Sequence, residues 1–236
     1  SYRSQELREG ENLDTITQNI YQRQIDNYDH QSQWYAINSA NDISKQMEIV
    51  NTAYTNRGLR LFNNFAANIS KENLDAYESH MNRYDGFAQI HHNNYAAFRA
   101  ETDSLLTRNY VVLADQTQDV SHLMAAIQRL YNYNDSYPAN SQFYENEELA
   151  MNYARNIYAE TLDGMDAGDY NPPAGAPADE AEAFAFLKRT ADRYIDVANQ
   201  ERFSNPARIA DTISIILLLG DIQLGNQKYP EAVAFY

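Results

Sequence analysis

Residues 74–105 read LDAYESHMNRYDGFAQIHHNNYAAFRAETDSL, and this stretch decides the fold class. Large or partly apolar side chains recur through it at steps of three and four: Leu74, Tyr77, Met81, Tyr84, Ala88, His91, Tyr95, Phe98, Thr102 and Leu105. Such spacing puts the side chains on one stripe of an α-helix, as at the a and d positions of a packing seam. The stretch therefore predicts unbroken helix with one face packed against other helices.

Similar stripes lie on both sides of this seam. One precedes it (Ile43, Met47, Val50, Tyr54, Leu61, Phe65) and one follows it (Leu106, Tyr110, Leu113, Thr117, Val120, Met124, Ile127, Tyr131). All six prolines lie at or beyond Pro138, so nothing earlier interrupts long helices. Ser70 offers an N-cap hydroxyl, and a bend or break of the helix is expected near Asp115. Residues 1–135 are thus predicted to form an antiparallel bundle of three or four long helices.

The main seam contains Tyr, Thr and His where an ideal coiled coil has Leu. In one interpretation the tyrosine rings pack as core while their hydroxyl groups reach the edge of the bundle. In the other, the polar groups line a pocket between helices. If that pocket exists, its ligand-binding residues are expected to be Tyr84, His91 and Tyr95.

A second helical domain is predicted for residues 136–236. The segment 132–146 is rich in turn-forming Asn, Asp, Ser and Pro, which marks a domain boundary. Further along, residues 163–178 form an acidic, proline-rich loop. Three helices are expected after it, from Asp179 to about Glu201, from Pro206 to about Leu224, and from near Pro230 to the last residue.

The last of these helices carry a family resemblance. A large residue (Ile216), a Leu-Gly pair (Leu219-Gly220), and a small residue followed four positions later by an aromatic one (Ala232, Tyr236) have the spacing of a tetratricopeptide repeat. The chain resembles that family in this part only, and most closely its periplasmic and lipoprotein members. The resemblance implies α-hairpins in which Gly220 and Ala232 let two helices approach while Ile216, Leu219 and Tyr236 pack around them.

Composition restricts the partners. The net charge of −15 repels nucleic acids and anionic lipid surfaces, which bind through Lys and Arg. The longest apolar run is far shorter than the roughly 20 residues of a membrane helix. We therefore predict no nucleic acid partner and no insertion of these residues into a membrane; a lipid anchor or membrane helix would have to lie outside them.

No catalytic or metal site is predicted. The absence of Cys removes thiolate chemistry and thiolate metal sites. His80 and His91 are too far apart in sequence for a helical ligand pair, and Asp163, Asp166 and Asp169 lack the alternation of a calcium-binding loop. Phosphate-binding, dinucleotide-binding and nucleophile motifs are also missing. We predict a non-enzyme without cofactor or metal.

These observations lead to one expected function and two alternatives. The expected function is a protein-interaction or assembly scaffold that presents its repeat-like helical surface to a protein partner, in the periplasm or at the outer membrane of a bacterium. The first alternative is a small-molecule sensing domain of a bacterial receptor, because long inward-polar helices are similar to such domains. The second is a helical lipoprotein that binds glycans or nutrients.

Overall fold

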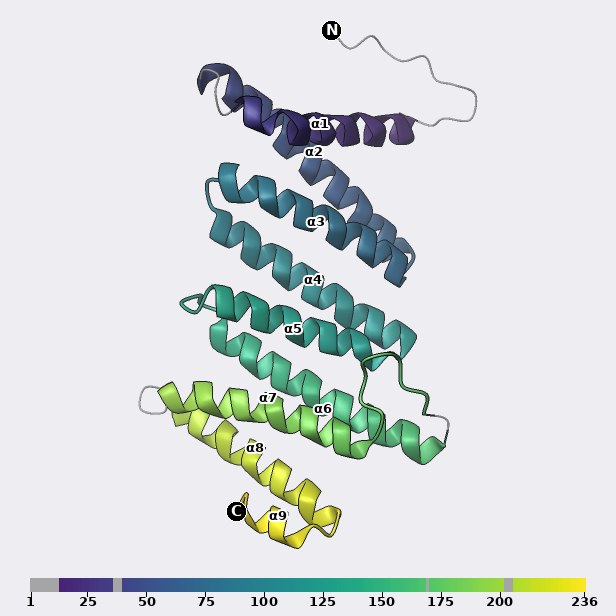
Figure 1. Cartoon of the computed structure of the whole chain (residues 1–236), viewed down its shortest axis with the longest axis vertical. Coiled ribbons are helices and arrows are strands. Elements are labelled where there is room, and N and C mark those ends of the chain that lie inside the picture. Colours follow the sequence, from purple (N-terminus) through teal and green to yellow (C-terminus); the bar gives the residue numbers. More distant parts are fainter. Residues whose placement is uncertain (1–12, 36–39, 169, 202–205) are drawn as a thin grey trace. The chain divides into compact units, whose positions relative to one another are not determined.

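The computed structural model describes residues 13–35, 40–168, 170–201 and 206–236. These residues form α-helices and no β-strand, which confirms the predicted all-α fold (Figure 1). Residues 1–12 of the first predicted domain lie outside the described part. The helices are α1 (Leu13–Tyr35), α2 (Ala40–Ala67), α3 (Lys71–His91), α4 (Tyr95–Thr117), α5 (Val120–Ser136), α6 (Phe143–Ala167), α7 (Glu180–Glu201), α8 (Pro206–Gly225) and α9 (Tyr229–Val233).

The chain divides into two compact units, residues 1–102 and residues 103–236. The division falls inside α4, whereas the sequence places the boundary at residue 135. The turn-forming segment at 132–146 instead contains the end of α5, a connection at 137–142 and the start of α6, and these two helices pack against each other within the second unit. A run of turn formers marks the end of a helix, and it does so between packed neighbours as well as between domains.

In the first unit, α2 packs against both α1 and α3. The predicted seam supplies much of its core, because Leu74, Tyr77, Met81, Tyr84 and Ala88 are all buried. The Tyr84 ring stacks on the ring of Tyr54 from α2, with 4.9 Å between centroids. Tyrosine therefore serves here as core, and its hydroxyl group meets polar partners at the edge of the aromatic cluster.

Two helix boundaries follow from local capping. Ser70 is the N-cap of α3 and accepts a hydrogen bond from the Asn73 amide, as predicted. Of the bend or break expected near Asp115, the structure has the break, since α4 ends at Thr117, Gln118 adopts a left-handed φ of 55°, and the Asp119 side chain caps α5. The break after Thr117 divides the predicted stripe of residues 106–131 between two helices, α4 and α5.

The prediction of one unbroken helix through 74–105 is wrong at residues 92–94. Helix α3 ends at His91, His92 is its extended C-cap, and α4 begins at Tyr95 after an Asn-Asn turn. The Asn94 side chain accepts a hydrogen bond from the Ala97 amide and so helps to start α4. With this break, residues 13–135 contain α1–α4 and nearly all of α5, five helices where three or four were predicted.

In the second unit, consecutive helices from α5 to α9 pack pairwise, and neighbours run antiparallel (Figure 1). The core lies between α5, α6, α7 and α8, and fully buried members include Met151, Ile157, Leu187 and Leu219. Helices α7 and α8 have nearly the predicted bounds. The last predicted helix starts as expected at Tyr229 but ends at Val233 instead of continuing to the last residue.

A buried polar network joins three helices of this unit. Glu147 of α6 is 1% exposed and accepts hydrogen bonds from Asn134 of α5 and from the Arg193 guanidinium of α7. Arg193 also donates to the exposed Asp135. Burial lowers the pKa of Arg193, but its bonds to Glu147 and Asp135 outweigh this and raise it above the ordinary value. The network therefore holds a full positive charge against a buried carboxylate.

Candidate functional site

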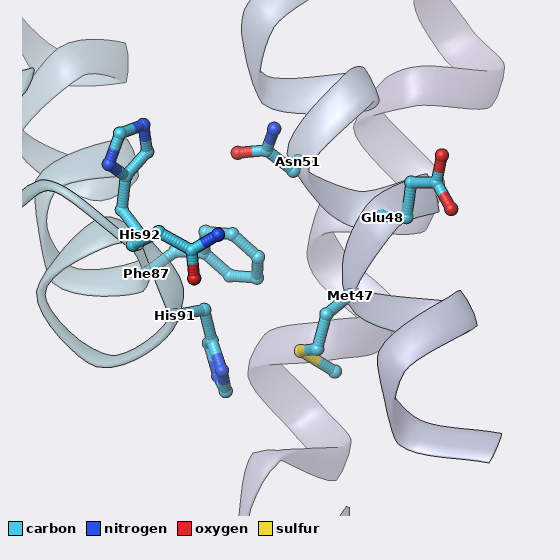
Figure 2. Close-up of a pocket in the computed structure, with 7 residues that line it drawn as sticks. Met47, Glu48, Asn51, Phe87, His91 and His92 are labelled. Carbon is cyan, nitrogen blue, oxygen red and sulfur yellow. The ribbon is translucent and has the colours of Figure 1, made fainter. Parts of the chain in front are cut away.

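A pocket of about 510 Å³ opens between α2 and the C-terminal end of α3 in the first unit (Figure 2). This volume lies within the range of small-molecule binding sites. Seven residues line it: Met47, Glu48, Asn51, Phe87, His91, His92 and Asn93. Its walls combine buried apolar side chains with amide and imidazole groups.

Helix geometry brings these side chains together. Met47 and Asn51 are four residues apart and share one face of α2, while Phe87 and His91 share one face of α3. Because α3 ends at His91, the C-cap His92 and then Asn93 leave the helical path and reach the same pocket. The helix break that the sequence pattern concealed therefore forms one wall of the site.

Two hydrogen bonds hold the pocket side chains in place. The Tyr28 hydroxyl lies 2.8 Å from His91 Nε2, and the Tyr84 hydroxyl donates to Asn51 Oδ1 over 2.8 Å. The Asn51 amide nitrogen has no protein partner among the described residues, so it can donate to a ligand. His92 Nδ1 accepts a hydrogen bond from the Asn94 amide, which leaves the proton of neutral His92 on Nε2.

The pocket carries little charge near its histidines. Burial lowers the pKa of His91, so its imidazole is neutral at pH 7. Glu48 is the one acidic residue among the described lining residues, and its carboxyl group is directed away from His91 and His92 (Figure 2). The arrangement offers hydrogen-bond donors and acceptors beside an aromatic ring and a thioether.

The three predicted ligand-binding residues have different places in the structure. His91 lines the pocket. Tyr84 is a buried core residue that touches the site only through Asn51. Tyr95 donates a hydrogen bond to Asp85, and Asp85 also pairs with Arg99, so the Tyr95 hydroxyl is engaged outside the pocket lining.

Sequence reasoning missed most of the pocket. Met47 was assigned to a packing stripe, and Asn51 and Asn93 were not singled out. The signal at Asn93 was local, because His92-Asn93-Asn94 combines a residue after a helix end with two turn formers. No sequence pattern marks Asn51 as a pocket residue, because it lines the pocket only through the packing of α2 against α3.

The histidines and acidic residues do not gather into a metal centre. His80 is buried, and its Nε2 lies 2.8 Å from the Tyr54 carbonyl oxygen. It precedes His91 by 11 residues in the sequence. Asp163 and Asp166 belong to α6 and not to a loop. Within the described ranges, no three His, Asp or Glu side chains are grouped so that they could hold a metal ion.

A second candidate site is the outer face of α8. Ile209, Ile213, Leu217 and Leu224 are each 44–52% exposed. At 100° per residue these positions fall within one arc of the helix and form an apolar stripe, with the Tyr236 ring over Gly220 in the same arc between Leu217 and Leu224. We call this set the α8 stripe. The exposed charged side chains of α8, α9 and the turn between them are Asp211, Asp221, Lys228 and Glu231, three acids and one base.

The residues of the repeat-like motif lie beside this stripe. Leu219 and Ala232 are buried, and Ile216 is half-buried. Gly220 lies against the Tyr236 ring, because a Cβ added at Gly220 would come within 2.8 Å of that ring. Tyr236 itself is 60% exposed and donates a hydrogen bond to Asp221. The close approach expected at Gly220 therefore involves the tyrosine ring.

None of the helices in the described residues combines the length and apolar character needed to cross a membrane.

Comparison of the chain with models of known protein families, with curated proteins and with solved structures gave no match.

Proposed function

We propose that this protein is a non-catalytic interaction scaffold, and that its α8 stripe binds an amphipathic helix of a partner protein whose polar face is basic. The supporting observation is the row of half-exposed Ile and Leu side chains along α8. Soluble proteins seldom leave such a row uncovered unless it takes part in binding.

The dimensions fit a helical ligand. From Ile209 to Leu224 the stripe extends for about 22 Å at 1.5 Å per residue, the length of about four helical turns. A partner helix with apolar anchors at i, i+3 or i+4, and i+7 can place them along such a row. Each large anchor that leaves water contributes about 1.5–3 kcal/mol of apolar burial before the entropic cost of association.

Charge favours a basic partner over a second copy of the chain. The exposed charged groups of α8, α9 and the turn between them are mainly acidic, although Asp211 lies on the side of α8 away from the stripe, and each copy has a net charge of −15. Two such chains repel each other, whereas Lys and Arg flanking an apolar face would be attracted and steered to the site.

Two synthetic helices test this proposal. They share one pattern of leucine anchors, and one carries lysines on its polar face while the other carries glutamates. We expect the lysine helix to bind more tightly, by about tenfold or more at low salt. We also expect Leu217→Glu to weaken its binding by at least about tenfold, because the substitution puts a charge in the apolar contact.

Leu59→Glu is the matched control, since Leu59 is exposed, apolar and helical but lies on α2. It should leave the affinity within about twofold. Equal binding of the two helices, or equal loss from both substitutions, would refute the proposed docking site. Isothermal titration calorimetry provides the affinities.

Two further parts of the proposal rest on the repeat-like motif. The consecutive antiparallel pairing of α5–α9 supports the likeness to tetratricopeptide repeats, which bind protein segments on helical surfaces. That same likeness, to periplasmic members in particular, is the reason we place the protein outside the cytoplasm.

A second candidate function is small-molecule sensing by the α2–α3 pocket. The observation that favours it is the set of Asn51, His91 and His92 around a cavity of suitable size. With little charge near the histidines, the pocket suits an uncharged polar molecule.

In a thermal-shift screen of sugars, polyols and primary amides, a ligand should raise the melting temperature of the wild type but not of Asn51→Ala. Asn56→Ala, which alters α2 outside the pocket lining, should behave as wild type; a flat screen would exclude this candidate.

A further inference from the structure

A second cavity lies between α5 and α7 in the second unit and has a volume of about 390 Å³. Its lining residues are Met124, Ile127, Gln128, Tyr131, Phe186, Arg189 and Thr190. The four large members are a thioether, a branched aliphatic chain and two aromatic rings, so the walls are mostly apolar. Arg189 is the only charged residue among them.

The charge of Arg189 is not neutralised by the protein. Among the described residues it makes no ion pair, and its one recorded contact is with the Phe186 ring, whose centroid lies 5.8 Å from its Cζ. Arg193, one turn further along α7, is in contrast fully paired with Glu147 and Asp135. Arg189 thus places an unpaired guanidinium at the edge of an apolar cavity, in a chain of net charge −15.

The cavity wall is also held firmly. Arg193 stacks on the Tyr131 ring at 4.0 Å, and its bonds to the buried Glu147 fix that stack. The Thr190 hydroxyl donates to the Phe186 carbonyl within α7. A rigid apolar wall reduces the entropy lost when a ligand binds.

We infer that this cavity binds a small carboxylate attached to an apolar group, such as an aromatic or medium-chain acid, with the carboxylate on Arg189 and the apolar part against Met124, Ile127 and Phe186. A guanidinium matches the geometry of a carboxylate through two parallel N–H donors. The site is separate from the α8 stripe, and the inference does not depend on the proposed docking function.

Three matched probes test the inference: 3-phenylpropionate, 3-phenylpropanamide and 3-phenylpropylamine. They share one hydrophobic group and carry a negative, neutral and positive end. Calorimetry with the full chain should show the acid binding at least about tenfold more tightly than the amine. Shifts in the methyl NMR signals of Met124 and Ile127 should accompany binding and place it in this cavity.

Arg189→Gln removes the charge but keeps a polar side chain at an exposed position, so the variant should fold. We expect it to weaken binding of the acid by about tenfold or more. Arg189→Glu should reverse the preference, so that the amine binds better than the acid. Lys188→Gln is the control, because it removes an adjacent positive charge that is paired with Asp192 outside the cavity lining.

The inference would be overturned by any of three results. These are no binding of the acid at millimolar concentration, equal binding of acid and amine, or unchanged affinity for the acid in Arg189→Gln. An equal loss in Lys188→Gln would also overturn it, because the effect would then come from overall charge.

Discussion

At the scale of single residues, Arg193 shows how burial decides how much an ion pair contributes to the stability of the fold. It binds two carboxylates, Glu147 at 0% side-chain exposure and Asp135 at 62%. Removing the buried partner leaves Arg193 Nε without an acceptor and takes from the Asn134 amide one of its two acceptors, whereas water can replace the exposed partner. The two bonds have the same length of 2.8 Å, so distance alone would not distinguish them.

We therefore predict that Glu147→Ala lowers the free energy of unfolding by about 3 kcal/mol, while Asp135→Ala lowers it by less than about 1 kcal/mol. Urea denaturation measures both. The double variant Glu147→Leu with Arg193→Met should recover part of the loss, because no buried charge then remains unpaired. If the loss of stability in this double variant equalled the sum of the losses from Glu147→Leu and Arg193→Met alone, the coupling between the two side chains would be contradicted.

His80 gives a prediction about pH. Burial lowers its pKa, and the charges of Arg57 and Arg83 lower it further, while its bond to the Tyr54 carbonyl opposes them. The unfolded chain, with an ordinary histidine pKa of about 6.5, then binds a proton that the folded chain does not. Stability should consequently fall as the pH drops below about 6.5. Melting temperatures between pH 7.5 and 5 should fall less steeply in His80→Gln; an identical slope in both proteins would contradict the assignment.

At the scale of helices, two glycines appear alike in sequence but differ in what surrounds them. A Cβ on Gly164 of α6 would meet the Tyr170 ring at 2.7 Å, and one on Gly220 of α8 would meet the Tyr236 ring at 2.8 Å. The Tyr170 hydroxyl donates to the Pro177 carbonyl and contacts Thr161, so its ring cannot easily move. Tyr236 is exposed and can swing away.

We predict that Gly164→Ala destabilises the protein by about 1–3 kcal/mol through overpacking. Gly220→Ala should be close to neutral, because better helix propensity of about 1 kcal/mol offsets the displaced Tyr236 contact. In a Tyr236→Ala background the same change should become stabilising. Chemical denaturation of the wild type, the three single variants and the double variant tests this, and equal effects at the two glycines would contradict it.

The helices also show which features a single sequence can predict. Repeating apolar positions identified the buried face of α3, and Ser70 identified its start, because these signals are local. On α5 the pattern was right for Val120 and Ile127 only, since Met124 and Tyr131 are partly exposed. The break after His91 escaped detection because Tyr95 and Phe98 keep the same three-and-four spacing across it. Asn51 and the α8 stripe could not be predicted, since their roles depend on which neighbouring helix covers which side chain.

At the scale of the whole molecule, the net charge of −15 governs the response to salt. Like charges repel one another in the compact chain, and raising NaCl from about 0.01 M to about 0.1 M shortens the Debye length from about 30 Å to about 10 Å. The melting temperature should therefore rise, by about 2–4 °C if the relief is about 1 kcal/mol. A fall would mean that surface ion pairs outweigh the repulsion.

The same salt should act in the opposite direction on the proposed partner. The negative charge that destabilises the fold also attracts a lysine-bearing helix to the α8 stripe. Added salt screens this charge, so it should weaken binding of the helix while it makes the protein itself more stable. Calorimetry and thermal melts in matched buffers should thus give trends of opposite sign. If binding strengthened with salt, apolar burial alone would explain the affinity, and the partner would not need a basic face.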